Sequence, residues 1–208
     1  MWKLQRILAM PALYRLFGRV AAGNAYDAYV RDFVRPVAGQ RVLDIGCGPG
    51  DILARLPDVD YLGIDHHAPY IAAARKRYGN RGTFRCEDVA ASVIRDAGAF
   101  DLVMANGLLH HLNDDEVRNL LRLAARALKP SGRLVTLDGC FVPEQSRMAR
   151  FLLRMDRGNH VRPPDAYASL AAEVFGTVQP VVRHDLMRIP YTHIILTCSD
   201  AVAARQAA

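Results

Sequence analysis

The sequence lacks most features that would place it outside the ordinary globular class. Its 208 residues include four cysteines and one tryptophan. A transmembrane helix needs about 18 or more consecutive apolar residues, and no such run occurs, so none is expected. Lys3 and Arg6 precede apolar residues, but no small-residue cleavage site follows, which argues against a secretory signal.

Cysteine pairs at metal-binding or redox spacing are also missing. No Cys-x-x-Cys occurs, so neither a structural zinc site nor a redox motif is indicated. Each cysteine lies in or beside an apolar run, and we expect buried, reduced thiols in a cytoplasmic protein. The four residues concerned are Cys47, Cys86, Cys140 and Cys198.

Acidic residues are the minority charge, 21 against 27 basic residues, giving a formal net charge of +6. Such a charge can steer an anionic substrate, an acidic carrier protein or an anionic membrane face toward the protein. Basic and aromatic residues do not alternate, so nucleic acid is disfavoured as a partner. Hydrophobic residues at 51% and charged residues at 23% indicate one domain with a large core.

What the sequence does contain is a glycine-rich turn. Residues 42–45 are typical of a buried strand, and Gly46, Gly48 and Gly50 follow. Glycine permits a tight turn and a close approach of backbone to ligand, and the N–H groups of a following helix would point into that turn. A dinucleotide-binding turn reads Gly-x-Gly-x-x-Gly, whereas residue 51 here is an acid that would repel a pyrophosphate. A nicotinamide cofactor is therefore disfavoured.

Strand-like and helical patterns alternate after residue 40, which predicts a parallel sheet with helices on both faces. The expected strands lie at about 41–45, 60–65, 82–86, 100–105 and 132–138, and the expected helices at about 50–56, 69–78 and 114–128. Beyond residue 140 we expect a helix at 144–157, a polar loop at 156–164, a helix at 166–175 capped by Asp165, and strands at 177–184 and 191–198. The last two strands are joined by a short connection, which makes them antiparallel.

The first 35 residues are predicted to be helical. Leu13, Leu16, Phe17 and Val20 follow a helical spacing, and a second helical stretch covers 24–34. These helices can cap a ligand pocket, pack on the core or lie peripherally on a membrane surface. Packing or capping is favoured because the apolar face is short.

Acids follow the strands that come after the glycine turn. Asp65 ends the second strand about 20 residues on, a distance that fits one strand-helix-strand unit and a ribose-binding acid. Asp88 follows the third strand, and residues 106–112 read Asn-Gly-Leu-Leu-His-His-Leu after the fourth. Taken in order, residues 40–138 resemble the class I S-adenosylmethionine-dependent methyltransferases.

This resemblance implies the fold: an α/β, Rossmann-like, seven-stranded, mostly parallel sheet with a C-terminal antiparallel hairpin and an N-terminal helical cap. It places a single domain over 1–208. Its expected parts are N-terminal helices at 1–35, a cofactor-binding core at 36–140, an acceptor-side insertion at 141–176 and a terminal hairpin at 177–198.

The resemblance also implies S-adenosylmethionine as the cofactor. Asp65 would accept both ribose hydroxyls, and Asp44 would bind the amino group or order water. His66 would lie over the adenine, while Asp88 and the Val89 N–H would read its polar edge. Each acid also has a simpler interpretation as a strand-end residue or, for Asp88, a helix cap. The full expected set is Asp44, Gly46, Cys47, Gly48, Asp65, His66, Asp88, Val89, Asn106 and Gly107.

The turn after the fourth strand bears on the acceptor. Methyltransferases of DNA-base amines carry Asn/Asp-Pro-Pro-aromatic there, which this chain lacks. Its Leu-His-His-Leu resembles the small-molecule and lipid-precursor branch, such as quinone and natural-product methyltransferases. His111, and after it His110, is the candidate general base, because an imidazole can take the proton of a hydroxyl as the methyl group arrives. Packing histidines are an equal alternative, and metal binding lacks a nearby acidic cluster.

Arg157, His160 and Arg162 lie where related enzymes build an acceptor lid, and the arginines would suit a carboxylate or phosphate. A solvated loop is the alternative. We therefore interpret the chain as an S-adenosylmethionine-dependent methyltransferase of a small-molecule or lipid-like acceptor, with O-methylation favoured over C- or N-methylation. A methyltransferase of RNA or protein and a non-catalytic cofactor-binding scaffold remain as alternatives, and no feature specifies an oligomeric state.

Overall fold

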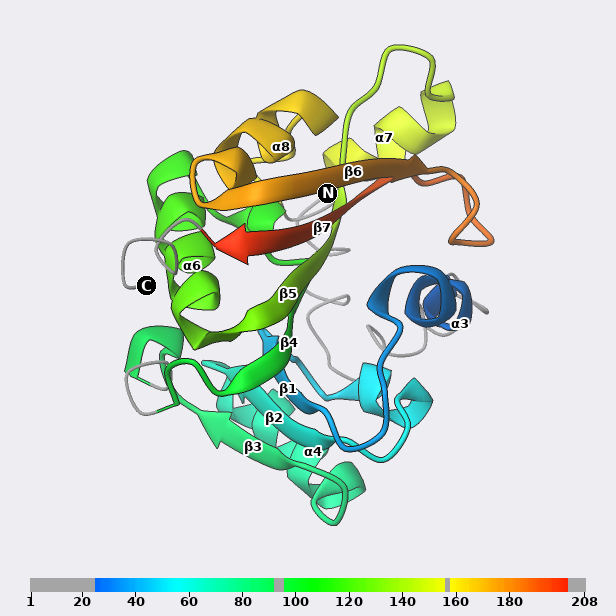
Figure 1. Ribbon diagram of the computed structural model, residues 1–208. Helices are drawn as coiled ribbons and strands as arrows, with labels where there is room; N and C mark the ends of the chain where they lie inside the picture. Colours follow the sequence, from blue (N-terminus) through cyan, green and yellow to red (C-terminus); the bar gives the residue numbers. More distant parts are fainter. Residues whose placement is uncertain (1–24, 92–95, 156–157, 202–208) are drawn as a thin grey trace.

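A seven-stranded sheet forms the centre of the protein (Figure 1). The structure is a computed structural model that describes residues 25–91, 96–155 and 158–201. The strand order is β3-β2-β1-β4-β5-β7-β6; β3 to β5 pair in parallel, and β7 is antiparallel to both of its neighbours. This confirms the predicted fold class. The strands are β1 Arg41–Ile45, β2 Asp60–Asp65, β3 Thr83–Cys86, β4 Phe100–Asn106, β5 Leu128–Gly139, β6 Phe175–Arg183 and β7 His193–Ala201.

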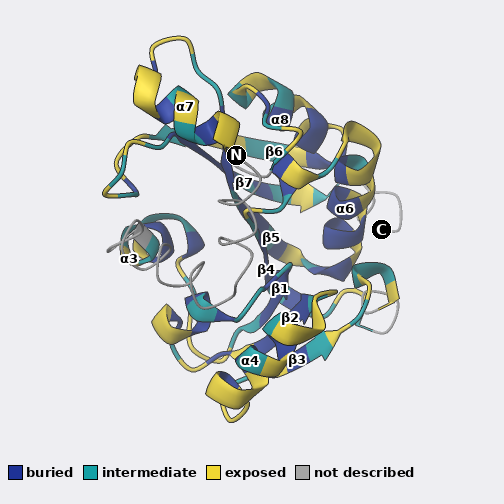
Figure 2. Ribbon diagram, turned by 180° about the vertical axis from the view of Figure 1, so that it is seen from behind, coloured by how far each residue is buried: buried dark blue, intermediate teal, exposed yellow. Residues whose placement is uncertain are grey.

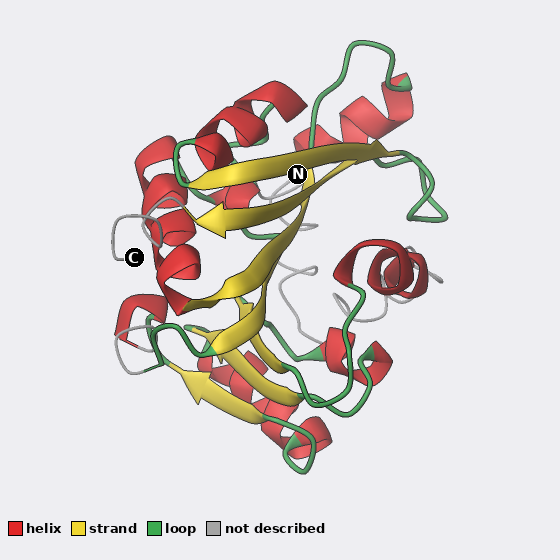
Figure 3. Ribbon diagram, in the orientation of Figure 1, coloured by secondary structure: helices red, strands yellow, loops and turns green. Residues whose placement is uncertain are grey.

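Helices cover both faces of this sheet (Figure 3). The helices α6 and α8 pack on one face, and α3, η1, η2 and α4 pack on the other. The helical elements are α3 Ala25–Tyr29, the π-helix η1 Val30–Val34, the 3-10 helices η2 Asp51–Arg55 and η3 Leu109–His111, and α4 Ala68–Tyr78, α6 Asp114–Ala127, α7 Arg147–Met155 and α8 Pro164–Ala172.

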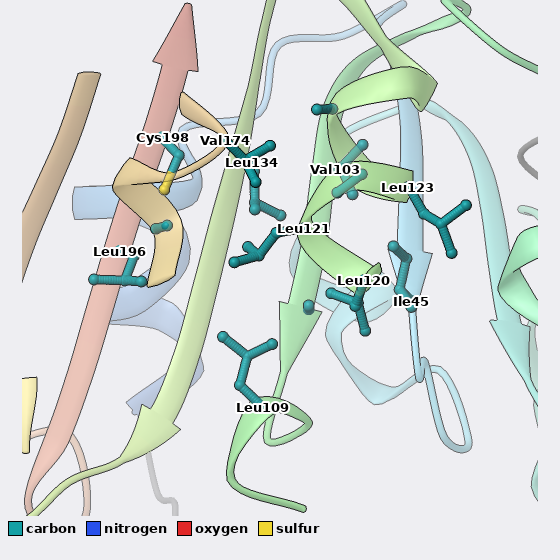
Figure 4. Packing of buried hydrophobic residues seen from close by; sticks show 14 of the residues in the cluster. Ile45, Val103, Leu109, Leu120, Leu121, Leu123, Leu134, Val174, Leu196 and Cys198 are labelled. Atoms are coloured by element: carbon teal, nitrogen blue, oxygen red, sulfur yellow. The ribbon is translucent and has the colours of Figure 1, made fainter. Parts of the chain in front are cut away.

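The apolar side chains of the central strands divide between these two layers because side chains alternate along a strand. On β4, Val103 and Ala105 pack toward α6, while Leu102 and Met104 pack toward the α3 side. Figure 4 shows Leu120 and Leu121 of α6 within the first of these clusters. In Figure 2 the central strands are mostly buried, whereas the edge strands β3 and β6 and the outer helix faces are largely intermediate or exposed. A strand buried on both faces explains the nearly continuous apolar runs in the sequence.

Helix α6 begins at Asp114, as predicted, and ends at Ala127, one residue before the predicted end. Asn113 accepts the Glu116 N–H at 3.0 Å, and the Glu116 carboxylate accepts the Asn113 N–H at 2.8 Å, which completes a capping box. The predicted turn after it is instead the start of β5, which begins at Leu128 with an irregular register. At Gly132 a Cβ would lie 2.8 Å from the Phe100 carbonyl oxygen, so the glycine serves strand pairing there.

Other boundaries also differ from prediction. Helix α7 begins at Arg147 rather than 144, and α8 begins at Pro164 with Pro163 as its N-cap, so Asp165 lies in the first turn and is not the cap. The thiol of Cys86 is exposed, whereas the other three cysteines are buried as expected. The predicted helix before residue 24 lies outside the described residues.

Candidate functional site

The predicted glycine turn lies between the carboxyl ends of β1 and β2. Gly46, Gly48 and Gly50 have φ angles of 70°, 54° and 73°, a left-handed conformation that favours glycine. The N–H groups of Gly46 and Cys47 donate to the Ile64 carbonyl oxygen at 2.8 and 3.0 Å. These bonds fix the turn against the end of β2. The left-handed φ angles of the turn explain why glycine occupies these positions.

The three glycines differ in what surrounds them. A Cβ at Gly46 would lie 3.2 Å from a methyl group of Leu108, and a Cβ at Gly50 would lie 2.9 Å from the Phe84 ring. At Gly48 no atom of the described residues stands within 4 Å of that position. The backbone of Gly48 is therefore approachable, as a residue that contacts a ligand through its main chain must be.

Asp65 stands at the end of β2, beside this open position. Its carboxylate accepts the Gly48 N–H at 2.9 Å and the His67 N–H at 2.7 Å, and its side chain is 10% exposed. An ionised carboxylate offers about four lone-pair sites. Asp65 thus retains acceptor capacity for two more donors, which is what a ribose diol presents.

Asp44 lies one strand away and is buried with Tyr61. The Tyr61 hydroxyl donates to Asp44 Oδ2 at 2.6 Å. Burial raises the pKa of Asp44 to about 7, against the opposing effect of the Tyr61 hydrogen bond, and the charge of Asp65 raises it further. A carboxyl group with this pKa changes its charge near neutral pH.

If Asp44 holds the cationic amino group of the cofactor, affinity must depend on pH. The fraction of ionised Asp44 grows as pH rises toward its pKa near 7, and only the ionised form attracts a cation. We expect the Kd for S-adenosylmethionine to fall as pH rises from 5.5 to 7.5, by up to about tenfold per unit on the acid side. Equilibrium dialysis across this range measures the slope. Asp44→Asn should flatten it, whereas an equal slope in the variant would contradict the assignment.

The other predicted cofactor-binding residues that follow β1, β2 and β3 differ in their burial and contacts. Cys47 is buried, and burial raises the pKa of its thiol, so a nucleophilic role is disfavoured. The His66 side chain is 94% exposed. Asp88 accepts the Ala90 N–H at 2.7 Å at the start of a helical turn, the geometry of the alternative cap. Val89 is half-buried and packs on the core.

Asn106 ends β4, on the other side of β1, and Gly107 follows it. The Tyr29 hydroxyl donates to Asn106 Oδ1 at 2.6 Å, and the Gly107 N–H donates to the Leu137 carbonyl oxygen at 2.7 Å. Tyr29 is fully buried, and Asp27 of the same helix bonds Arg55 at 2.9 Å. The N-terminal helix α3 therefore covers the carboxyl ends of β1 and β4.

His110 lies beyond this point and is bonded to a buried acid. Its Nδ1 is 2.8 Å from Asp138 Oδ1, and its backbone N–H donates to the same oxygen at 3.2 Å. The His110 and Asp138 side chains are 6% and 0% exposed. Burial raises the pKa of Asp138, and the bond to His110 opposes that rise. Asp138 Oδ2 is buried without a hydrogen-bond partner among the residues that the structure describes.

The loop predicted as an acceptor lid reaches His110. The His160 N–H donates to the His110 carbonyl oxygen at 3.0 Å, and a Cβ at Gly158 would overlap the His110 ring. The exposed His111 ring lies 4.2 Å from that of His110 between centroids. The structure thus brings His110, His111 and His160 together, while Arg157 lies outside the described residues.

Arg162 differs from its predicted neighbours because its guanidinium is buried. It donates to Asp114 at 2.7 and 2.9 Å. It also donates to the carbonyl oxygens of Leu109, Leu112 and His160 at 2.7 to 3.0 Å. With its donors engaged in this way, Arg162 ties the turn after β4 to the loop before α8.

We expect Arg162→Gln to destabilise the protein by about 3 kcal/mol, because it leaves buried carbonyl oxygens without donors. Thermal and urea unfolding would measure the loss. Arg188→Gln is the matched control, since Arg188 is exposed and makes no ion pair with any described residue. Equal stability of the two variants would instead favour a role of Arg162 in acceptor binding.

A cavity of about 260 Å³ lies farther along the same sheet edge, beyond β5. The Thr192 carbonyl oxygen accepts the Cys140 N–H at 3.1 Å, which places the cavity wall beside the end of β5. Both polar and apolar groups line it, from Glu144, Gln145, Ser146, Ala149, His184, Pro190, Tyr191 and Thr192. Within the described ranges, no three His, Cys, Asp or Glu side chains cluster as metal ligands would.

The chain is similar in sequence to known methyltransferases. Residues 42–132 match the sequence profile of the family described as a methyltransferase domain. An uncharacterized methyltransferase of Mycobacterium tuberculosis is 34% identical over 115 residues, 54% of this chain and 56% of the relative. The 27-O-demethylrifamycin SV methyltransferase of Amycolatopsis mediterranei is 37% identical over 114 residues, 51% of this chain and 41% of its own length.

Among solved structures, a TehB-like S-adenosylmethionine-dependent methyltransferase of Corynebacterium glutamicum shares the fold. Its TM-score is 0.59 at 17% identity, over 84% of this chain and 87% of the other. The chain spans about half the length of the curated relatives that it matches. No helix in the described part of the chain is long and apolar enough to cross a membrane.

Proposed function

We propose that this chain transfers a methyl group from S-adenosylmethionine to a hydroxyl of a small-molecule or lipid-like acceptor, which its match to a methyltransferase-domain family and its fold support. When bound, S-adenosylmethionine supplies a methyl group already activated on a sulfonium. The glycine turn and Asp65 fit it: open backbone at Gly48 lies beside a carboxylate with spare acceptor capacity. The protein's task is then mainly to hold two reactants aligned.

The pair of His110 and Asp138 is the observation that carries O-methylation. Transfer to a hydroxyl releases a proton, and a histidine can accept it. An ionised Asp138 accepts the Nδ1–H of His110, which sets the tautomer with its basic lone pair on Nε2 and stabilises the imidazolium that forms. We therefore place His110 ahead of His111 as the base, the reverse of the order favoured by the sequence.

The acceptor class is supported by two further observations. The cavity of about 260 Å³ beyond β5 lies at the same sheet edge as Asp138 and is close in volume to the smallest ligand sites, which begin at about 300 Å³. The relative from Amycolatopsis mediterranei is named for a small-molecule acceptor. His160, one of the candidates from the predicted lid, lies against His110 at this edge.

Transfer of radiolabelled methyl from S-adenosylmethionine into a cell extract tests the proposal. The extract is separated afterwards into organic-soluble, small aqueous, nucleic-acid and protein pools. We expect label in the organic-soluble or small aqueous pool, attached through an ether or ester oxygen. Label in nucleic acid or protein would overturn the acceptor class. Cofactor binding without label in any pool of varied extracts would favour a non-catalytic scaffold.

A further inference from the structure

Helix α7 presents an apolar stripe away from the core. Met148, Phe151 and Met155 are 55%, 56% and 39% exposed, whereas Ala149 and Leu153 are buried. Successive residues of an α-helix lie about 100° apart. The three exposed side chains therefore share one narrow arc, and the two buried ones lie on the opposite side. Figure 2 shows this alternation of exposed and buried segments along α7.

Burial against the core accounts for only one of these two faces. The other large apolar side chains exposed in the described ranges, Val37 and Val181, stand singly in the sequence. Single exposed apolar residues are ordinary on a protein surface, but a contiguous patch indicates an interaction site. The stripe formed by Met148, Phe151 and Met155 is such a patch.

Arginines border the stripe on one side. Helix α7 contains Arg147, Arg150 and Arg154 and no acidic residue. Arg150 donates to the Val142 carbonyl oxygen at 2.9 Å. Arg147 and Arg154 are exposed, and neither forms an ion pair with a residue in the described ranges. The helix therefore combines exposed apolar groups with positive charge that the described protein does not neutralise.

We propose that α7 docks the protein on an anionic lipid bilayer. Phe151 and the two methionines would enter the boundary between headgroups and acyl chains, and Arg147 and Arg154 would pair with lipid phosphates. A second copy of the chain is a poorer occupant, because it would bring the same arginines together. Residues 1–24 also carry Lys3, Arg6, Arg15 and Arg19 and no acid, so their charge has the same sign.

Docking by α7 would bring the carboxyl edge of the sheet toward the bilayer. A Cβ at Gly139, the last residue of β5, would lie 2.6 Å from Leu153, so α7 packs directly on this edge. A lipid-like acceptor would then reach Asp138 and His110 from the membrane side. Only this consequence rests on the proposed function, because docking itself requires neither cofactor nor turnover.

Sedimentation of the full chain with vesicles tests the docking. The vesicles contain phosphatidylcholine alone or with about one third phosphatidylglycerol. We expect binding to the anionic vesicles only. Arg147→Gln with Arg154→Gln should weaken it roughly 25-fold, at about fivefold for each basic residue. Phe151→Ser with Met148→Ser should weaken it by about tenfold or more. Arg122→Gln with Arg126→Gln on α6 is the matched control, because both arginines are exposed and distant in sequence from the stripe.

Two results would overturn the proposal. One is that the wild type sediments equally with both vesicle types or with neither. An acidic protein would then be the partner of α7. The other is unchanged binding of the α7 variants together with loss of binding when Lys3, Arg6, Arg15 and Arg19 are replaced by Gln. Thermal unfolding of each variant confirms that lost binding is not lost structure.

Discussion

Replacement of Asp65 by Ala is expected to weaken binding of S-adenosylmethionine by about 100-fold or more. Two hydrogen bonds from ribose hydroxyls to an ionised carboxylate are worth about 3 kcal/mol or more together, which corresponds to that factor. The carboxylate also accepts the Gly48 and His67 N–H groups, so its removal loosens the turn that holds the cofactor. Isothermal titration calorimetry of wild type and variant gives the two Kd values.

Asp60→Ala is the matched control for this experiment. Asp60 begins the same strand, is exposed and bonds Arg41 at 2.9 Å at the opposite edge of the sheet. We expect its Kd to equal that of the wild type. A thermal midpoint of Asp65→Ala close to the wild type, together with undiminished affinity, would show that ribose does not bind Asp65.

Replacement of Asp138 by Asn should reduce the methyl-transfer turnover number by about 100-fold or more, the usual contribution of a general base. The amide oxygen can still accept the Nδ1–H, but a neutral amide cannot balance the charge of an imidazolium. Cofactor affinity should not change, because two strands, β1 and β4, lie between the strands that carry Asp138 and Asp65. Single-turnover transfer of labelled methyl measures the chemical step apart from binding.

The pH profile separates a positioning role of Asp138 from a purely structural one. The imidazolium loses its buried anionic partner in Asp138→Asn, so the pKa on the acid limb of kcat/KM should fall relative to the wild type. His110→Gln should lose the limb altogether. If Asp138→Asn unfolds at a lower temperature but keeps the wild-type acid limb, Asp138 is only a packing residue. If His110→Gln keeps the wild-type rate, His111 is the base instead.

Much of this site could be predicted because its signals are local. The glycine turn covers residues 46–50, and the capping box of α6 covers residues 113–116, so each pattern is confined to a few residues of sequence. Parallel strands place their carboxyl ends at one edge, so the order of the strands was enough to bring Asp44 and Asp65 together. The fold class follows from the same alternation of apolar runs and helical patterns.

The parts that could not be predicted depend on pairs distant in sequence. Tyr29 and Asn106 are 77 residues apart, and His110 and Asp138 are 28 apart. Asp138 reads in the sequence as one more polar residue at the end of an apolar run. Its place at the end of the predicted strand 132–138 was the signal available, since acids at the ends of β1 and β2 had already been assigned functions.

Arg162 shows the limit of reasoning from residue type. An arginine in a polar loop suggests a solvated or anion-binding side chain, yet here Asp114 and three carbonyl oxygens surround the guanidinium. Cys86 departs from expectation in the other direction, because β3 is an edge strand and leaves its last residue exposed.

The central claim is that the cofactor lies across the glycine turn with its ribose on Asp65. A crystal structure with S-adenosylhomocysteine tests it most directly. We predict both ribose hydroxyls within hydrogen-bond distance of the Asp65 carboxylate and the ligand against the backbone of Gly48. A ligand bound elsewhere, or one that leaves Asp65 in contact only with Gly48 and His67, would contradict the account.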